Sequence, residues 1–186
     1  NLINQGWITF RMRAMLVSFA SYDLWLDWRG FAHHLAKLFT DYEPGIHYSQ
    51  LQMQSGVTGI NTYRIYNPVK QSKEHDENGD FIKKWVPELQ NLNSNWVHEP
   101  WKMDFETQKK FRCIIGKDYP HPIVDHKEAV SLAKSKIAEI RKGVNFKTIA
   151  KKVYVKHGSR NSNRDNNFVD RKLKKIKPNK QLSLSF

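Results

Sequence analysis

The chain has 186 residues, 39% of them hydrophobic and 12% aromatic, which is enough for one domain with a buried core and an appendage. No apolar run approaches the roughly 20 residues that a membrane-spanning helix needs, and the first residues lack the apolar core and small-residue cleavage site of a signal peptide. The single cysteine, Cys113, excludes an internal disulfide and a cysteine-built zinc or iron–sulfur site, so we expect a soluble protein of the cytoplasm without a metal site.

The apolar pattern of the first third of the chain predicts helices. Residues 8–28 predict one long helix, because apolar side chains recur there at helical spacing. Gly30 is expected to end this helix, and a second helix is expected over residues 31–40. A loop over residues 41–45, which contains adjacent proline and glycine, then leads to a short helix over residues 49–54.

Turn signals are frequent in the middle of the chain. Residues 57–79 contain an Asn-Pro and an Asn-Gly pair, and residues 90–122 contain three prolines, so both stretches are expected to be irregular. Helices are expected over residues 80–85 and over residues 124–141, where apolar residues form one stripe. No segment alternates long enough for a strand, so the fold class is predicted to be all-α.

The net charge of +13 is concentrated toward the C-terminus. From Lys142 to Lys180 there are 13 lysines and arginines and two acids, a net charge of +11, which leaves +2 for residues 1–141. We therefore divide the chain into a helical domain, 1–141, and a basic tail, 142–186, in which residues 158–167 lack apolar side chains and are expected to be disordered. Such a tail attracts DNA phosphates through counterion release, and the alternative is a solvated tail that aids solubility.

Four stretches of this sequence carry a resemblance to a known family. They are GWITFRMR at 6–13 with SF at 18–19 and DLWLDWR at 23–29, YRIYNP at 63–68, GDFIKKWVPEL at 79–89, and HEPW at 98–101 with DYPHPIVDH at 118–126. In this order and spacing they resemble the C-terminal part of the FAD-binding helical domain of the DNA photolyase/cryptochrome family. The resemblance covers residues 6–130 and implies a multi-helical fold, FAD as cofactor, and electron transfer driven by blue light.

Complete members of that family have further parts. They carry an N-terminal α/β antenna domain and an earlier half of the helical domain, which binds the FAD phosphates and adenine. The 186 residues contain neither part, so the resemblance implies only the isoalloxazine side of the flavin site. An antenna chromophore is expected only if an upstream N-terminal domain exists.

The resemblance assigns cofactor-binding roles to five positions. Arg13 and Asp41 match a pair beside the reactive edge of the flavin, where a fixed cation stabilises the negative charge of the reduced ring. Tyr42 lies between Asp41 and Glu43, and Glu43 matches a second acid near the flavin pyrimidine ring. His47 falls where photolyases usually have the asparagine that faces flavin N5, and an imidazole there can donate a hydrogen bond or a proton. The alternatives are an ordinary helix–helix salt bridge and a loop histidine bonded to the backbone.

The family's tryptophan chain for electron transfer is only partly present. Trp28 matches the middle member, but Leu51 stands where the member next to the flavin is expected. Tyr22, Trp25 and Tyr48 are candidate substitutes, because each lies within a turn or a short loop of the site. The alternative for each is aromatic packing in the core.

Several positions match residues that contact DNA in the family. Arg11 matches a contact to the damaged strand, Lys70 matches a second DNA contact, and Arg64 is a third candidate partner for a phosphate. Phe10 and Met53 differ from the residues that surround the flipped pyrimidine dimer in repair enzymes. Met53 replaces a tryptophan whose stacking on a base is worth roughly 1–3 kcal/mol, and Phe10 is expected to compensate in part.

The last six residues form a second motif. Gln181, Leu182, Leu184 and Phe186 resemble the Gln-Leu-x-Leu-x-Phe peptide that binds the bacterial sliding clamp. Apolar anchors at the end of a disordered tail suit a hydrophobic groove on such a partner. The alternative is a chance match of six residues.

Three functions follow from these observations. The first is a DNA photolyase, associated with the nucleoid, that repairs UV-induced pyrimidine dimers by electron transfer from reduced FAD. Base flipping costs least at a damaged site, which favours selection of the lesion. The second is a cryptochrome-type blue-light photoreceptor without repair activity, and the third is a flavin-free DNA-binding fragment.

Overall fold

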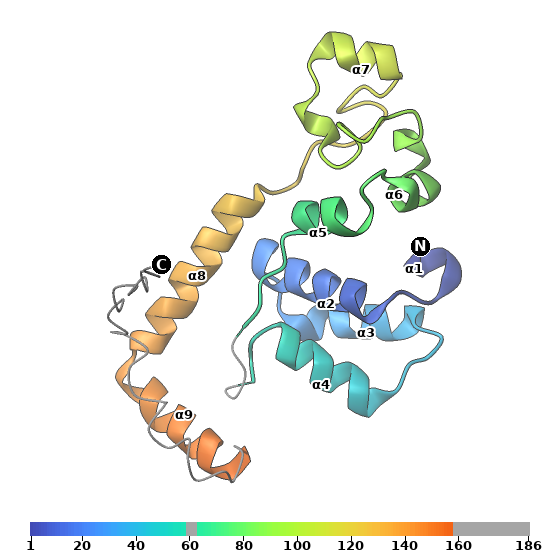
Figure 1. The fold of residues 1–186 in the computed structure, drawn as a ribbon. Coiled ribbons are helices and arrows are strands. Elements are labelled where there is room, and N and C mark those ends of the chain that lie inside the picture. Colours follow the sequence, from blue (N-terminus) through green and yellow to red (C-terminus); the bar gives the residue numbers. More distant parts are fainter. Residues whose placement is uncertain (59–62, 158–186) are drawn as a thin grey trace, which may run out of the picture.

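The computed structural model describes residues 1–58 and 63–157, and their regular structure is helical (Figure 1). Apart from one isolated bridge between Ile115 and Tyr119, no β-pairing occurs in these residues, which confirms the all-α prediction. The helices are α1 (Leu2–Gln5), α2 (Phe10–Ser18), the π-helical turn η1 (Phe19–Asp23), α3 (Trp28–Leu38), α4 (Pro44–Gln54), α5 (Pro68–His75), α6 (Asp80–Trp85), the 3₁₀ turns η2 (Pro87–Leu89) and η3 (Pro100–Lys102), α7 (Phe105–Phe111), α8 (His126–Lys142) and α9 (Val144–His157).

The prediction of one long helix over residues 8–28 is wrong, because the helical segment formed by α2 and η1 ends at Asp23 and α3 begins only at Trp28. Trp25 adopts a left-handed backbone conformation with φ of 52°, which no helix continues. Asp27 then caps α3 by accepting a hydrogen bond from the Arg29 N–H at 3.0 Å. Gly30 therefore lies inside α3 rather than at a helix end.

Other element boundaries also differ from the prediction. Helix α4 begins at Pro44, five residues earlier than expected, because proline suits the first helical position. The Asn67-Pro68 pair starts α5 rather than a simple turn, and α7 begins after its cap Asp104 within a stretch predicted to be irregular. Helix α9 occupies the first part of the basic tail. The helices expected over residues 80–85 and 124–141 correspond to α6 and α8.

Helices α2, α3 and α4 pack side by side and form the part of the fold that holds the site, with α5 next to α2 (Figure 1). Val17, Ala32 and Leu51 contribute one buried residue from each of the three helices. A neighbouring cluster joins Leu2, Ile8 and Phe39 and closes the end of the bundle near the N-terminus. Burial of these apolar side chains fixes the relative positions of the three helices.

Residues 80–122 enclose a second apolar cluster around α6, the 3₁₀ turns and α7. Leu89, Leu92, Val97 and Met103 are buried there together with Cys113, which is fully inaccessible. Burial raises the pKa of the Cys113 thiol, so this cysteine is a structural residue rather than a reactive one.

Helix α8 leaves the bundle and leads to α9 (Figure 1). Its first residue, His126, contacts the carboxylate of Asp23 through Nδ1, which is an ion pair when the imidazole is protonated. The Asp23 side chain is completely buried in η1. Neither this helix nor any other in residues 1–58 and 63–157 is long and apolar enough to cross a membrane. The disorder expected at 158–167 and the clamp-binding peptide expected at 181–186 lie outside the described residues.

Candidate functional site

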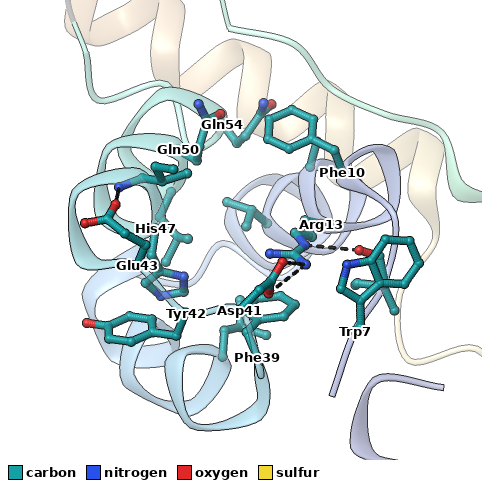
Figure 2. Close-up of a pocket in the computed structure, with 16 residues that line it drawn as sticks. Trp7, Phe10, Arg13, Phe39, Asp41, Tyr42, Glu43, His47, Gln50 and Gln54 are labelled. Carbon is teal, nitrogen blue, oxygen red and sulfur yellow. Dashed lines mark hydrogen bonds and ion pairs between the residues drawn. The ribbon is translucent and has the colours of Figure 1, made fainter. Parts of the chain in front are cut away.

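A pocket of about 300 Å³ lies between α2, the segment that joins α3 to α4, and α4 (Figure 2). This volume is at the lower end of the range for small-molecule sites, roughly 300–1,000 Å³. Most of its wall is apolar or aromatic. Polar side chains enter it at six positions, which are Arg13, Asp41, Glu43, His47, Gln50 and Gln54.

Arg13 is held in one orientation by three neighbours. Its Nε donates to the Ile8 carbonyl at 3.1 Å, and its Nη2 donates to both carboxylate oxygens of Asp41 at 3.0 and 2.8 Å. The guanidinium carbon also lies 4.2 Å from the ring centroid of Phe39, within cation–π range. The Arg13–Asp41 contact predicted from the sequence is therefore formed, and it places a fixed positive charge at the pocket wall.

The loop that carries Asp41 is attached to the start of the chain through Gly6. The Gly6 carbonyl accepts hydrogen bonds from the Thr40 N–H at 2.9 Å and from the Thr40 hydroxyl at 3.2 Å. Gly6 has φ of 67°, and a Cβ at this position would lie 2.5 Å from the Thr40 methyl group, so only glycine permits this close approach. The hydrogen bonds that Arg13 donates to the Asp41 carboxylate hold the pKa of Asp41 below its ordinary value of 3.8, so this carboxylate stays ionised.

Glu43 and Tyr42 stand at the start of α4. The Glu43 carboxylate accepts a hydrogen bond from the Ile46 N–H at 2.6 Å, so it caps the helix as well as lining the pocket. A hydrogen bond with Tyr48 raises the pKa of Tyr42. Both residues expected beside the cofactor therefore reach the pocket, and each also has a partner within the protein.

His47 is buried in the pocket wall against the rings of Phe39, Tyr42 and Tyr48. Its Nε2 lies 3.0 Å from the Ala32 carbonyl, and because a carbonyl only accepts, this nitrogen carries the hydrogen. In the neutral ring Nδ1 is then an acceptor. The expectation that His47 donates toward a ligand therefore requires the doubly protonated imidazolium.

Sequence reasoning missed Gln50 and Gln54, which also line the pocket. The Gln50 Oε1 atom is buried, and no hydrogen-bond partner for it exists in the described part of the chain. The two glutamines lie three and seven residues after His47 in α4, a spacing that places all three side chains on one face of the helix. The missed signal was the start of α4, because a helix that begins at Pro44 places all three side chains on one face.

Of the candidate aromatic substitutes, Tyr48 lies between Trp28 and the pocket. The ring centroids of Trp28 and Tyr48 are 6.5 Å apart, and those of Tyr48 and His47 are 5.1 Å apart. Trp28 does not line the pocket itself, and Tyr22 and Trp25 line a separate hollow near α8. Leu51 is buried in the wall, where it packs with Val17 and Ala32 of the neighbouring helices.

The residues expected to contact DNA lie outside the pocket, with one exception. Arg11 is exposed and its Nη1 donates to Gln71 of α5 at 3.2 Å, one residue from the exposed Lys70. Arg64 is also exposed. Phe10 is 58% exposed and lines the pocket, whereas Met53 is half-buried and does not line it.

The part of the chain that the structure describes contains no group of three or more His, Cys, Asp or Glu side chains that could hold a metal ion. The fold and the pocket define a helical domain with a hollow of small-molecule size, whose mainly apolar wall carries an ion pair and a buried histidine. Residues 1–139 match the family described as the FAD binding domain of DNA photolyase. The chain belongs to this family.

Named relatives include both photolyases and cryptochromes. The chain is 40% identical over 139 residues to a deoxyribodipyrimidine photo-lyase of Alkalihalophilus pseudofirmus, an alignment that covers 72% of this chain and 29% of the relative. The crystal structure of a bacterial class III photolyase from Agrobacterium tumefaciens matches with a TM-score of 0.70 and 29% identity over 76% of this chain and 30% of that one. A Synechocystis cryptochrome structure matches with a TM-score of 0.69 and 29% identity over 72% and 28%. The chain thus spans less than a third of the length of these relatives.

Proposed function

We propose that this chain supplies the isoalloxazine-binding side of a light-dependent DNA photolyase that repairs UV-induced pyrimidine dimers with reduced FAD. The observation that carries this proposal is the Arg13–Asp41 pair at the wall of the pocket, in a chain of the photolyase FAD-binding family. A cation held by hydrogen bonds and a ring contact needs no rearrangement to stabilise a negative charge that develops nearby.

The residues of the pocket fit the ring system of a flavin. The wall is mainly apolar and aromatic, as a planar heterocycle requires, and Gln50 Oε1 is a buried acceptor that lacks a donor among the described residues. His47 Nδ1 offers a second acceptor, or a donor when the ring is protonated. When bound, FAD supplies the light-excited electron donor for the reaction. Arg13, Asp41, Tyr42, Glu43 and His47 would hold and orient it.

DNA contact is proposed for the exposed basic residues beside the pocket. Arg11 of α2 and Lys70 of α5 belong to two helices that the Arg11–Gln71 hydrogen bond joins. Arg64 precedes α5 and is exposed as well. Side chains of this kind bind phosphates and position a nucleic acid without reading its sequence. Docking of residues 181–186 on a sliding clamp remains a prediction.

The test is a repair assay with the full chain. Purified protein is mixed with FAD and dithionite, and then with a short UV-irradiated oligothymidylate, and the dimers that remain are counted after blue light or darkness. We expect light-dependent loss of dimers with the wild type and at least a tenfold slower loss with Arg13→Leu. Absence of flavin absorbance in the protein fraction after gel filtration would contradict the proposal.

A cryptochrome-type photoreceptor is the second candidate function. The observation in its favour is the set of departures near the pocket, with buried Leu51 and non-lining Met53 at positions where repair enzymes have tryptophans. The same assay separates the two candidates. A protein that binds FAD and changes its absorbance in blue light, but leaves all dimers intact, is a photoreceptor rather than a repair enzyme.

A further inference from the structure

One edge of the pocket carries two neutral amides, Gln50 and Gln54, which are not among the five residues proposed to hold and orient the flavin. Gln50 and Gln54 are one helical turn apart on α4, so their side chains share a face. Figure 2 shows both, together with Phe10 of α2, along one edge of the pocket, and Phe39, Asp41 and Tyr42 along the opposite edge. The edge formed by Phe10, Gln50 and Gln54 is called the amide edge below.

Both amides lack hydrogen-bond partners among the described residues. Gln54 is only 8% exposed, yet no hydrogen bond of its side chain exists within residues 1–58 and 63–157. The Gln50 Oε1 atom is buried without a donor in the same part of the chain. A buried polar group left unpaired costs free energy, so the unpaired Gln50 Oε1 atom, one helical turn from the nearly buried Gln54 side chain, indicates that a ligand completes the hydrogen bonds at this edge.

The charged side chains nearby do not pair with the two amides. The charges of Arg13 and Asp41 satisfy each other, and Glu43 is engaged with the N–H of Ile46. The hydrogen-bonding groups that stay unpaired at the amide edge are therefore uncharged. They suit a neutral ligand that presents a hydrogen-bond donor next to an acceptor. A carboxamide matches such an edge with its own acceptor oxygen and donor nitrogen, as glutamine does with the edges of bases.

Resting on the proposed function, we infer that Gln50 and Gln54 bind a cyclic imide, a planar ring in which one N–H stands between two carbonyl groups. The imide N–H supplies the donor that Gln50 Oε1 lacks, and a flanking carbonyl accepts from an amide N–H. The exposed ring of Phe10 offers a stacking face on the same edge. Thymine and the pyrimidine ring of a flavin both contain this imide group. The imide that binds at the amide edge therefore belongs either to a thymine base or to the flavin.

The test uses the full chain with two probes, riboflavin and a UV-irradiated oligothymidylate, and with the N3-methylated form of each. Dissociation constants are measured by fluorescence for the wild type, Gln50→Met and Gln54→Met. Methionine keeps the length of glutamine but cannot form its hydrogen bonds. Gln52→Met is the matched control, because Gln52 lies on the same helix but does not line the pocket.

We expect N3-methylation to weaken wild-type binding of one probe about tenfold or more, and both pocket substitutions to weaken the same probe while Gln52→Met leaves it unchanged. Loss confined to riboflavin identifies the flavin as the source, and loss confined to the oligothymidylate identifies the base. If the wild type binds the probes but neither N3-methylation nor the substitutions alter binding, the inference is overturned while the proposed function stands. If the wild type binds neither probe, the proposed function itself fails, and the inference with it.

Discussion

At the scale of single residues, the ion pair of Arg13 and Asp41 gives a pH dependence with a defined sign. Arg13 holds the folded-state pKa of Asp41 below 3.8, whereas in the unfolded chain it is about 3.9. The pair therefore contributes stability above the unfolded pKa, and this stability is lost as the pH falls through the folded pKa. We expect a carbon-13 NMR titration of the Asp41 carboxyl to give a midpoint below 3.8.

Arg13→Leu is the matching substitution for this titration. It removes the hydrogen bonds that lower the pKa, so the Asp41 midpoint should rise toward the ordinary value. Asp27 is the internal control, because Arg29 lowers its pKa to about 2 independently of Arg13. A midpoint of Asp41 that is the same in both proteins would show that Arg13 does not control its ionisation.

The basic residues Arg11 and Lys70 are predicted to act on DNA affinity through phosphate contacts. Replacement of either by glutamine should weaken binding to irradiated and intact DNA alike, because phosphate contacts carry no sequence information. Each substitution should lower the slope of log affinity against log salt by about 0.9 for duplex DNA. Fluorescence anisotropy over a salt series measures both quantities, and an unchanged slope would remove that residue from the proposed interface.

At the scale of elements, the N-cap of α5 links a local sequence signal to the position of Lys70. The Asn67 side chain accepts a hydrogen bond from the Lys70 N–H at 2.9 Å, and Pro68 follows at the first helical position. Asn67→Ala should destabilise the helix by about 1 kcal/mol and increase hydrogen exchange of the α5 amides. Asn67→Asp keeps an acceptor at the cap and should leave exchange near that of the wild type, so equal exchange rates in the two variants would rule out capping by residue 67.

At the scale of the whole molecule, the contact between Asp23 of η1 and His126 of α8 joins α8 to the bundle. The Asp23 side chain is completely buried, and its Oδ2 has no hydrogen-bond partner in the described residues. Breaking a buried ion pair by removing one partner costs about 3–5 kcal/mol. We expect His126→Ala to lower the free energy of unfolding in urea by this amount.

Two further variants test whether the loss comes from a buried charge. The double variant Asp23→Asn with His126→Ala should recover part of the stability, because a neutral amide is less costly to bury than a carboxylate. Arg29→Ala breaks the ion pair with Asp27 at the surface, where both side chains are more than half exposed, and should change stability little. A His126→Ala variant as stable as Arg29→Ala would show that the contact with Asp23 does not hold α8.

Much of the architecture was predictable from the sequence because it follows from local chemistry. Helical spacing of apolar residues indicated an all-α fold, and α6 and α8 were expected close to where they lie. The start of α4 was missed because a glutamate cap followed by proline is a weak local signal, and with it the face that carries Gln50 and Gln54. The break between α2 and α3 was missed because Trp25 sits in a backbone conformation that its residue type does not predict.

The sequence alone determined the family, through motifs spread over residues 6–130, and it named Arg13 and Asp41 as a pair. Only the tertiary structure decided what that pair faces, because 28 residues separate the two and their meeting depends on how α2, α3 and α4 pack. The same packing directs His47 Nε2 to the Ala32 carbonyl and leaves the buried Gln50 Oε1 atom without a hydrogen-bond partner among the described residues. Local spacing fixes which side chains share a helix face, but the atoms that meet across helices are set by the apolar contacts between them.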